Sequence, residues 1–212
     1  MSGKGKSQNA EAIDWSEIRR RNYVSQLLSS RKWFESANEL EAASKLIKPQ
    51  VVAWWESLLV WQEKKRPVFL EFGYHAVHMM LSGFVIENLC KGALIPTMAF
   101  EERHEVETLA KLPKSFQTHK LRTLVRRCEL TVSPKEEELL HRLTRAVLWN
   151  GRYPIAVAFS DDMDRVTLDD GKHYSGSWLG ASDSERSEAL IGRLREHLGV
   201  PTTYRVIRDA NA

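Results

Sequence analysis

The chain has 212 residues, of which 42% are apolar, 28% charged and 9% aromatic. This composition excludes a disordered protein, and the length fits one domain with at most a small appendage. Because 31 Lys and Arg stand against 28 Asp and Glu, the net charge of +3 excludes nucleic-acid binding by a global basic field, although not by a local cluster.

Residues 1–12 are small and polar, which predicts a flexible tail. Residues 14–63 follow a helical pattern that we expect Pro49 to interrupt. Five residues before this proline are expected on one helix face: Trp33, Ala37, Leu40, Ser44 and Ile47.

The longest helix is expected to open at Pro67, in the first turn, where the missing N–H costs nothing. It is predicted to run to Cys90 and to end at Gly92 and Pro96. Apolar residues follow two of its faces, which is typical of a helix in the middle of a bundle. The first face carries Phe69, Phe72, Ala76, Met79, Gly83, Ile86 and Cys90, and the second carries Leu70, Tyr74, Val77, Leu81 and Phe84.

Three shorter helical segments follow. Residues 101–112 predict a short helix or ordered loop, and residues 118–128 predict a short helix. Ser133 and Glu136 form a capping box with proline at the first helical position, so a helix is expected to start there and to stop at Asn150.

Residues 155–182 contain Asp-Asp turn signals and short β-like runs, which indicate an irregular excursion or a hairpin. Residues 184–198 predict the final helix. The expected fold is therefore mainly α: an up-and-down helical bundle over residues 13–154, with residues 155–212 forming the excursion and a last helix packed on the bundle.

The N-terminal segment has no apolar stretch, which predicts no signal peptide, and no long uncharged apolar run predicts a membrane span. Cys90 and Cys128 lie in helix-like apolar patterns, which favours reduced thiols over a secreted disulfide scaffold. We therefore expect a cytoplasmic protein without membrane association.

A polar stripe follows the expected central helix at Glu71, His75, His78 and Ser82. Their spacing places a carboxylate and two imidazoles on one face, where they could meet a metal. Bundle metal sites recruit ligands from several helices, and no second matching motif is present. The favoured interpretation is a solvated or interface strip, and we expect neither a metal nor another cofactor.

The segment Lys111–Cys128 carries six Lys and Arg residues and no Asp or Glu. Such a cluster is typical of phosphate contact, and Phe116 and His119 could stack on bases. The alternative is a solvated helix face neutralised by the acidic runs at 101–107 and 136–138. Both interpretations stay open.

A second candidate surface lies at the end of the capped helix, where His141, Arg145, Trp149 and Arg152 share one side. Arginine presents a bidentate fork to phosphate, and a neighbouring aromatic ring can stack on a base. Alternatively, Trp149 packs in the core and the arginines pair with residues 136–138 or with the final helix.

Four stretches together resemble the HEPN superfamily (higher eukaryotes and prokaryotes nucleotide-binding domain). They are Trp33-Phe-Glu-Ser-Ala-Asn-Glu-Leu-Glu-Ala-Ala, residues 75–92 with Glu87 and Lys91, His119-Lys-Leu-Arg-Thr-Leu, and Trp149-Asn-Gly-Arg-Tyr-Pro. The resemblance implies a dimeric helical bundle with its site between protomers. Many members are metal-independent ribonucleases of toxin–antitoxin or phage-defence systems that use an R-x(4–6)-H motif, and others bind nucleic acid, nucleotides or proteins.

The chain departs from that motif. Counted from Arg145, the histidine would fall at residues 150–152, which are Asn, Gly and Arg, and no other arginine satisfies the spacing. Asn and Arg cannot replace an imidazole in proton transfer near neutral pH. We therefore favour a non-catalytic binding protein over a ribonuclease, although His119 or His141 could supply a displaced histidine.

The expected function is thus binding of RNA or a nucleotide by a homodimer, in a toxin–antitoxin or phage-defence setting. The alternatives are a ribonuclease with a displaced histidine and a protein-interaction adaptor. The residues expected to bind nucleic acid are Arg145, Asn150, Arg152, Tyr153, His119, Lys120 and Arg122.

Overall fold

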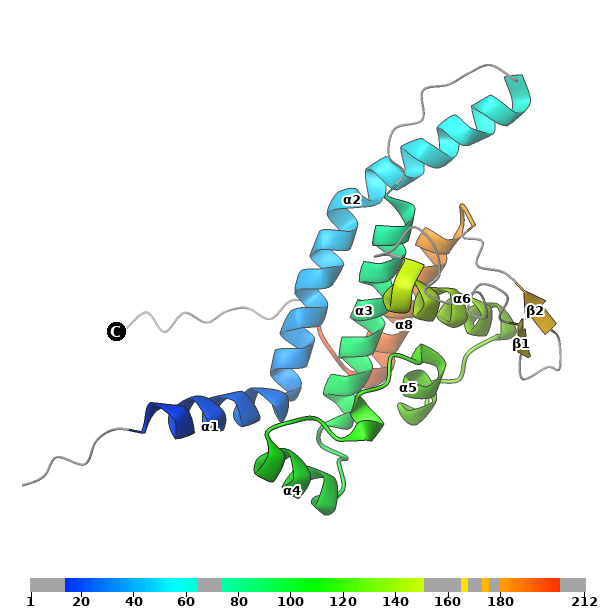
Figure 1. Ribbon diagram of the computed structural model, residues 1–212. Coiled ribbons are helices and arrows are strands. Elements are labelled where there is room, and N and C mark those ends of the chain that lie inside the picture. Colours follow the sequence, from blue (N-terminus) through cyan, green and yellow to red (C-terminus); the bar gives the residue numbers. More distant parts are fainter. Residues whose placement is uncertain (1–13, 65–73, 151–164, 168–172, 176–179, 203–212) are drawn as a thin grey trace, which may run out of the picture.

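The computed structural model describes residues 14–64, 74–150, 165–167, 173–175 and 180–202, and these form a mainly α bundle, as predicted (Figure 1). The expected tail at residues 1–12 lies outside the described residues. The helices are α1 (Trp15–Leu27), α2 (Ser30–Lys64), α3 (His75–Leu94), α4 (Phe100–Leu109), η1 (Lys114–Phe116), α5 (Leu121–Arg127), α6 (Pro134–Arg145), η2 (Ala146–Asn150) and α8 (Asp183–Leu198). Within the described ranges, none of them combines the length and apolar character that a bilayer crossing requires.

Helix α3 is the centre of the bundle and packs against α2, α5, α6, η2 and α8. The first of its two expected apolar faces is confirmed from Met79 onward, because Met79, Gly83 and Ile86 are buried, whereas Phe69 and Phe72 lie outside the described residues. The second face is only partly covered, since Tyr74 and Val77 are exposed. Burial of the first face places the hydrophobic core around α3 and makes this helix the scaffold for the surrounding surface.

The start of α3 differs from the prediction. Tyr74 has a left-handed backbone with φ of 45°, so the helix begins at His75, and Pro67 lies outside the described residues. Its end also differs, because Gly92 lies inside the helix. A Cβ at Gly92 would stand 2.6 Å from the ring of Phe34, so the glycine permits close approach of α2 rather than terminating α3.

Helix α2 continues through Pro49, so the predicted interruption is wrong and α2, with 35 residues, is the longest helix. Proline removes one backbone hydrogen bond and crowds the preceding turn, which usually bends a helix rather than ending it when packing holds both halves. Figure 1 shows α2 changing direction near its middle. Buried Ser44 and Val51 hold the chain on either side of the proline.

The predicted start of α6 is confirmed in detail. Ser133 accepts a hydrogen bond from the backbone of Glu136, whose side chain accepts one from the backbone of Ser133. The helix continues into η2, a π-helical turn that ends at Asn150, where the capped helix was expected to stop. The buried face of α6 and η2 carries Leu139, Leu140, Leu143, Ala146 and Val147.

Two short strands lie in the expected excursion: β1 (Arg165–Thr167) and β2 (His173–Ser175). They pair antiparallel, with Arg165 opposite Ser175. The hairpin interpretation is confirmed to that extent, while the Asp-Asp-Gly turn signal at residues 169–171 lies outside the described residues.

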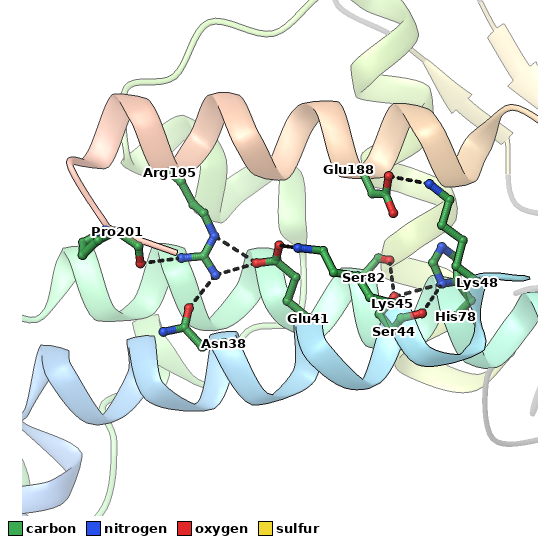
Figure 2. Close-up of polar contacts among 10 residues, drawn as sticks. All are labelled: Asn38, Glu41, Ser44, Lys45, Lys48, His78, Ser82, Glu188, Arg195 and Pro201. Carbon is green, nitrogen blue, oxygen red and sulfur yellow. Dashed lines mark hydrogen bonds and ion pairs between the residues drawn. The ribbon is translucent and has the colours of Figure 1, made fainter. Parts of the chain in front are cut away.

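A polar seam joins α8 to α2 and α3, and Figure 2 shows its side chains. Arg195 donates to Asn38 and, through Nε and Nη2, to Glu41 at 3.0 and 2.7 Å. Although burial opposes ionisation, hydrogen bonds from Lys45 and Arg195 hold the pKa of Glu41 below its ordinary value. The final helix is therefore fixed to the bundle by paired charges as well as by its apolar face.

Replacing Gly83 with alanine should destabilise the protein by about 1–3 kcal/mol, although alanine favours helices. The new Cβ would stand 2.6 Å from Val147 Cγ2 and 3.1 Å from the Leu143 carbonyl oxygen. Gly192 of α8 is the matched control, because its Cβ would meet nothing within 4 Å. Gly192→Ala should stabilise by about 0.5–1 kcal/mol in urea unfolding. A Gly83→Ala protein as stable as wild type would contradict this packing.

Candidate nucleic-acid interface

The basic segment, residues 111–127, is placed by three apolar anchors of α5. Leu121, Leu124 and Val125 are fully buried against the core. The backbone N–H of Leu121 also donates to Thr144 Oγ1 on α6 at 3.2 Å. Because these anchors occupy the inner side of a two-turn helix, the charged residues between them are directed toward its outer surface.

Three lysines of the basic segment are exposed: Lys111, Lys114 and Lys120. Within the described part of the chain, none of the three forms an ion pair. The acidic side chain that reaches this segment from α4 is Glu102, which accepts a hydrogen bond from Ser115. These lysines are therefore not paired directly with the acidic runs, and their charges face solvent.

The arginines of α5 are partly neutralised. Arg122 and Arg126 both donate to Oε1 of Glu137 on α6, at 3.3 and 3.2 Å. Glu137 is buried, whereas half of the Arg126 side chain is exposed. Because two guanidinium groups share one carboxylate, one positive charge remains in excess at this surface. The hydrogen bonds to Glu137 also fix the orientation of both arginines.

Phe116 does not lie on the surface, and its expected stacking on bases is wrong. Its ring is fully buried in the core. The guanidinium carbon of Arg127 lies 5.0 Å from the ring centroid, and Arg127 Nη1 donates to the Ser115 carbonyl at 2.7 Å. The aromatic residue thus positions Arg127 and is not available to a ligand.

His119 lies at the edge of the basic segment and contacts a buried ion pair of α3. Its Nδ1 is 2.9 Å from Oε2 of Glu87, whose Oε1 accepts from Lys91 Nζ at 2.6 Å. Glu87 and Lys91 are buried, whereas 45% of the His119 side chain is exposed. Lys91 also lies 5.8 Å from the centroid of the Trp33 ring. A carboxylate held in this way fixes the imidazole orientation and leaves Nε2 without a required internal role.

The second candidate surface is not assembled as expected. Arg145 is buried with 4% of its surface exposed, so its predicted place on an outward face is wrong. Asn150 ends η2, and Arg152 and Tyr153 lie outside the described residues. Among the described residues, His119 hydrogen-bonds with Glu87 and not with Arg145.

Arg142 follows the alternative interpretation of that surface. Its Nε and Nη2 donate to the two carboxylate oxygens of Asp183 at 2.9 and 2.8 Å, and both side chains are buried. Glu138 lies 3.9 Å from the same guanidinium. Arg142 therefore ties α6 to the start of α8, and His141 beside it is half-buried. Arg142 is structural in this arrangement.

The polar stripe of α3 is interior, not solvated. His78 Nδ1 lies 2.9 Å from Ser44 Oγ, and Nε2 lies 2.6 Å from Ser184 Oγ, so the imidazole joins α2 to α8. Ser82 lies 3.4 Å from the same Ser44 hydroxyl (Figure 2). Glu71 lies outside the described residues, and the described side chains include no cluster of three or more metal-ligating groups.

His75 is also buried, and this burial keeps its imidazole neutral. The indole N–H of Trp55 donates to its Nδ1 at 2.7 Å, so a proton on that nitrogen would oppose another donor. Burial lowers the pKa of His75 to about 4, and burial lowers the pKa of His78 as well. Both imidazoles contribute to the fold rather than to a site on the surface.

Stability should fall as pH decreases from 7 to 5. The unfolded chain binds protons on these histidines below about pH 6.5, whereas folded His75 stays neutral until about pH 4, so acid favours unfolding. The cost at His75 reaches at most about 3 kcal/mol at pH 4. Urea unfolding at pH 7 and pH 5 should show a smaller pH effect in His75→Gln than in wild type. His104→Gln, at an exposed histidine of α4, is the control. An unchanged pH effect in His75→Gln would contradict this assignment.

Comparison with protein-family models, with curated proteins and with solved structures finds no match to this chain. The geometry alone therefore bears on function. His119, Lys111, Lys114 and Lys120 are exposed along the basic segment, Arg122 and Arg126 are paired with Glu137, and Arg145 is buried. The roles of Glu87 and Glu137 as supports of the basic segment were missed, because their partners lie 32, 15 and 11 residues away in sequence.

Proposed function

We propose that the chain is a non-catalytic RNA-binding protein whose basic segment contacts the phosphate backbone. The observation that carries this proposal is the exposure of Lys111, Lys114 and Lys120 without ion pairs in the described structure. Phosphates bind such lysines with release of counterions, and this contribution to the binding free energy requires no recognition of bases. Arg126 and His119 extend the same charged segment.

RNA is favoured over a single nucleotide because the cations of the basic segment are distributed along the chain from Lys111 to Arg126. A mononucleotide offers few phosphates, whereas a single strand places successive phosphates along an extended basic surface. The expected binding is therefore multivalent, weak or moderate at physiological salt, and largely independent of sequence. Competition separates the ligands: unlabelled RNA should displace a labelled RNA strand at far lower phosphate concentration than a mononucleotide.

A ribonuclease is the second candidate function, and the Glu87–His119 contact is the observation that favours it. A carboxylate at Nδ1 orients an imidazole so that Nε2 can accept or donate a proton, as in other general acid–base sites. Against this candidate, the motif position after Arg145 lacks histidine and Arg145 is buried. We therefore keep binding without cleavage as the first proposal.

One experiment tests both candidates. Purified protein is incubated with a short labelled single-stranded RNA at low salt, and binding is followed by fluorescence anisotropy and integrity by denaturing electrophoresis. We expect binding and intact RNA. Cleavage that disappears in His119→Gln, or in His141→Gln, would replace the proposal with the ribonuclease. No binding at low salt would leave the protein-interaction adaptor as the better account.

The resemblance set out above also predicts a homodimer and a place in a toxin–antitoxin or phage-defence system, and both stay predictions. Support for pairing comes from exposed large apolar side chains at Trp15 and Tyr23 of α1 and Leu59 of α2. Such residues supply contact area at interfaces. Light scattering at micromolar concentration should give about twice 24.4 kDa. A particle of monomer mass would count against the dimer.

A further inference from the structure

The two cysteines of the chain lie side by side in the fold although 38 residues separate them in sequence. Cys90 belongs to α3, and Cys128 is the C-cap residue of α5. The Cys128 thiol lies 3.8 Å from the carbonyl oxygen of Cys90, and each thiol shifts the pKa of the other. Both are free thiols. Two neighbouring thiols on different elements are the starting point for a disulfide that joins those elements.

The two thiols differ in access and in acidity. Cys90 is fully buried, whereas 8% of Cys128 is exposed. The hydrogen bond with Cys90 lowers the pKa of Cys128, against the effect of burial and with help from the neighbouring charge of Arg127. The same hydrogen bond and burial raise the pKa of Cys90. Cys128 is thus the thiol that a small oxidant reaches first, and Cys90 is the thiol next to it.

The backbone around Cys128 is held in place after α5 ends. His197 of α8 hydrogen-bonds through Nε2 with the Cys128 carbonyl at 2.7 Å, and Glu129 follows in a left-handed conformation with φ of 60°. This turn keeps the Cys128 side chain directed at α3. The contact between the thiols is therefore a fixed feature of the α3–α5 packing.

We propose that Cys90 and Cys128 are a redox-active pair that closes into an intramolecular disulfide on reaction with a hydroperoxide. The Cys128 thiolate attacks the peroxide oxygen, the O–O bond breaks, and Cys128 becomes a sulfenic acid while the leaving hydroxide takes a proton to form water. The Cys90 sulfur then attacks the Cys128 sulfur, the S–O bond breaks, and the hydroxyl leaves with the Cys90 proton as a second water. Two thiols are oxidised by two electrons and one hydrogen peroxide is reduced.

The modification joins the central helix to the helix that carries the basic segment. Arg126 and Arg127 immediately precede Cys128, so a covalent bond at this position fixes the C-terminal end of α5 on α3. The proposal itself does not depend on RNA binding, because it concerns only the two thiols and a peroxide.

The test uses the full chain, reduced and then freed of reductant, and treated with hydrogen peroxide under native conditions. Remaining thiols are blocked with a maleimide, and intact-mass and non-reducing peptide analysis follow. We expect the chain to lose two hydrogens, to take up no maleimide and to yield a peptide that links residues 90 and 128. Dithiothreitol should restore both labelling sites.

Two variants separate the steps. Cys90→Ala should stop at a sulfenic acid on Cys128 that dimedone traps, and Cys128→Ser should leave the buried Cys90 reduced. Circular dichroism verifies that each variant is folded, and the wild-type result stands if one is not. The proposal is overturned if wild type stays reduced, if Cys128 proceeds to sulfinic acid without the linked peptide, or if only disulfides between chains form.

Discussion

Replacement of Asp183 with alanine is expected to destabilise the protein by about 3–5 kcal/mol, which is a large part of the stability of a typical domain. Asp183 accepts two hydrogen bonds from Arg142 and one from the backbone N–H of Gly180. Its removal would leave the Arg142 guanidinium buried without its principal counter-charge. Chemical unfolding of the purified variant, monitored by helical circular dichroism, measures the loss.

An exposed ion pair is the control for this prediction. Glu35 accepts from Arg31 and Lys32, whose side chains are largely exposed, so Glu35→Ala should cost about 1 kcal/mol or less. A double variant that replaces Arg142 and Asp183 with apolar residues of similar volume should recover much of the stability lost in Asp183→Ala. Equal effects of Asp183→Ala and Glu35→Ala would show that the buried pair does not hold α8 on α6.

Replacement of Lys111, Lys114 and Lys120 with glutamine should weaken RNA binding at low salt by roughly ten- to a hundredfold. Glutamine keeps most of the aliphatic side chain and removes the charge, and the exposed positions tolerate the change. The variant should unfold at the same denaturant concentration as wild type. Fluorescence anisotropy with the labelled RNA gives both dissociation constants.

A variant with the same net charge separates a local effect from a global one. Arg31, Lys32 and Lys45 of α2 are exposed and already paired with Glu35 or Glu41. Their replacement with glutamine removes three charges from another part of the molecule. If this variant binds RNA as weakly as the lysine variant, the protein binds through its overall charge and the basic segment has no special role.

Much of the fold could be predicted from the sequence because its signals are local. The capping box at Ser133 and Glu136 fixes a helix start within four residues, and the apolar spacing of α5 and α6 identifies their buried faces. Pro49 shows where local rules fail. Packing of α2 along α3 on both sides of the proline outweighs the loss of one backbone hydrogen bond, and no nearby residue signals this.

The candidate site was only partly predictable for the same reason. A polar stripe on a helix has the same sequence pattern whether it meets water or buried partners, and the partner of His78 on α8 lies 106 residues away. Arg145 resembled a surface arginine because its spacing from His141 and Arg152 puts all three on one side of the helix, whereas the structure buries Arg145. Lys120 and Arg122 could be identified because a cluster of cations without acidic neighbours is visible along the chain.

The salt dependence of RNA affinity tests the proposed function most directly. The logarithm of the association constant is measured against the logarithm of salt concentration for wild type, for the lysine variant and for the α2 control. Each lost phosphate contact should reduce the slope by about 0.7 on a single strand, so the lysine variant should lose about two units and the control none. Equal slopes in all three proteins, or no RNA binding by wild type at low salt, would contradict the account.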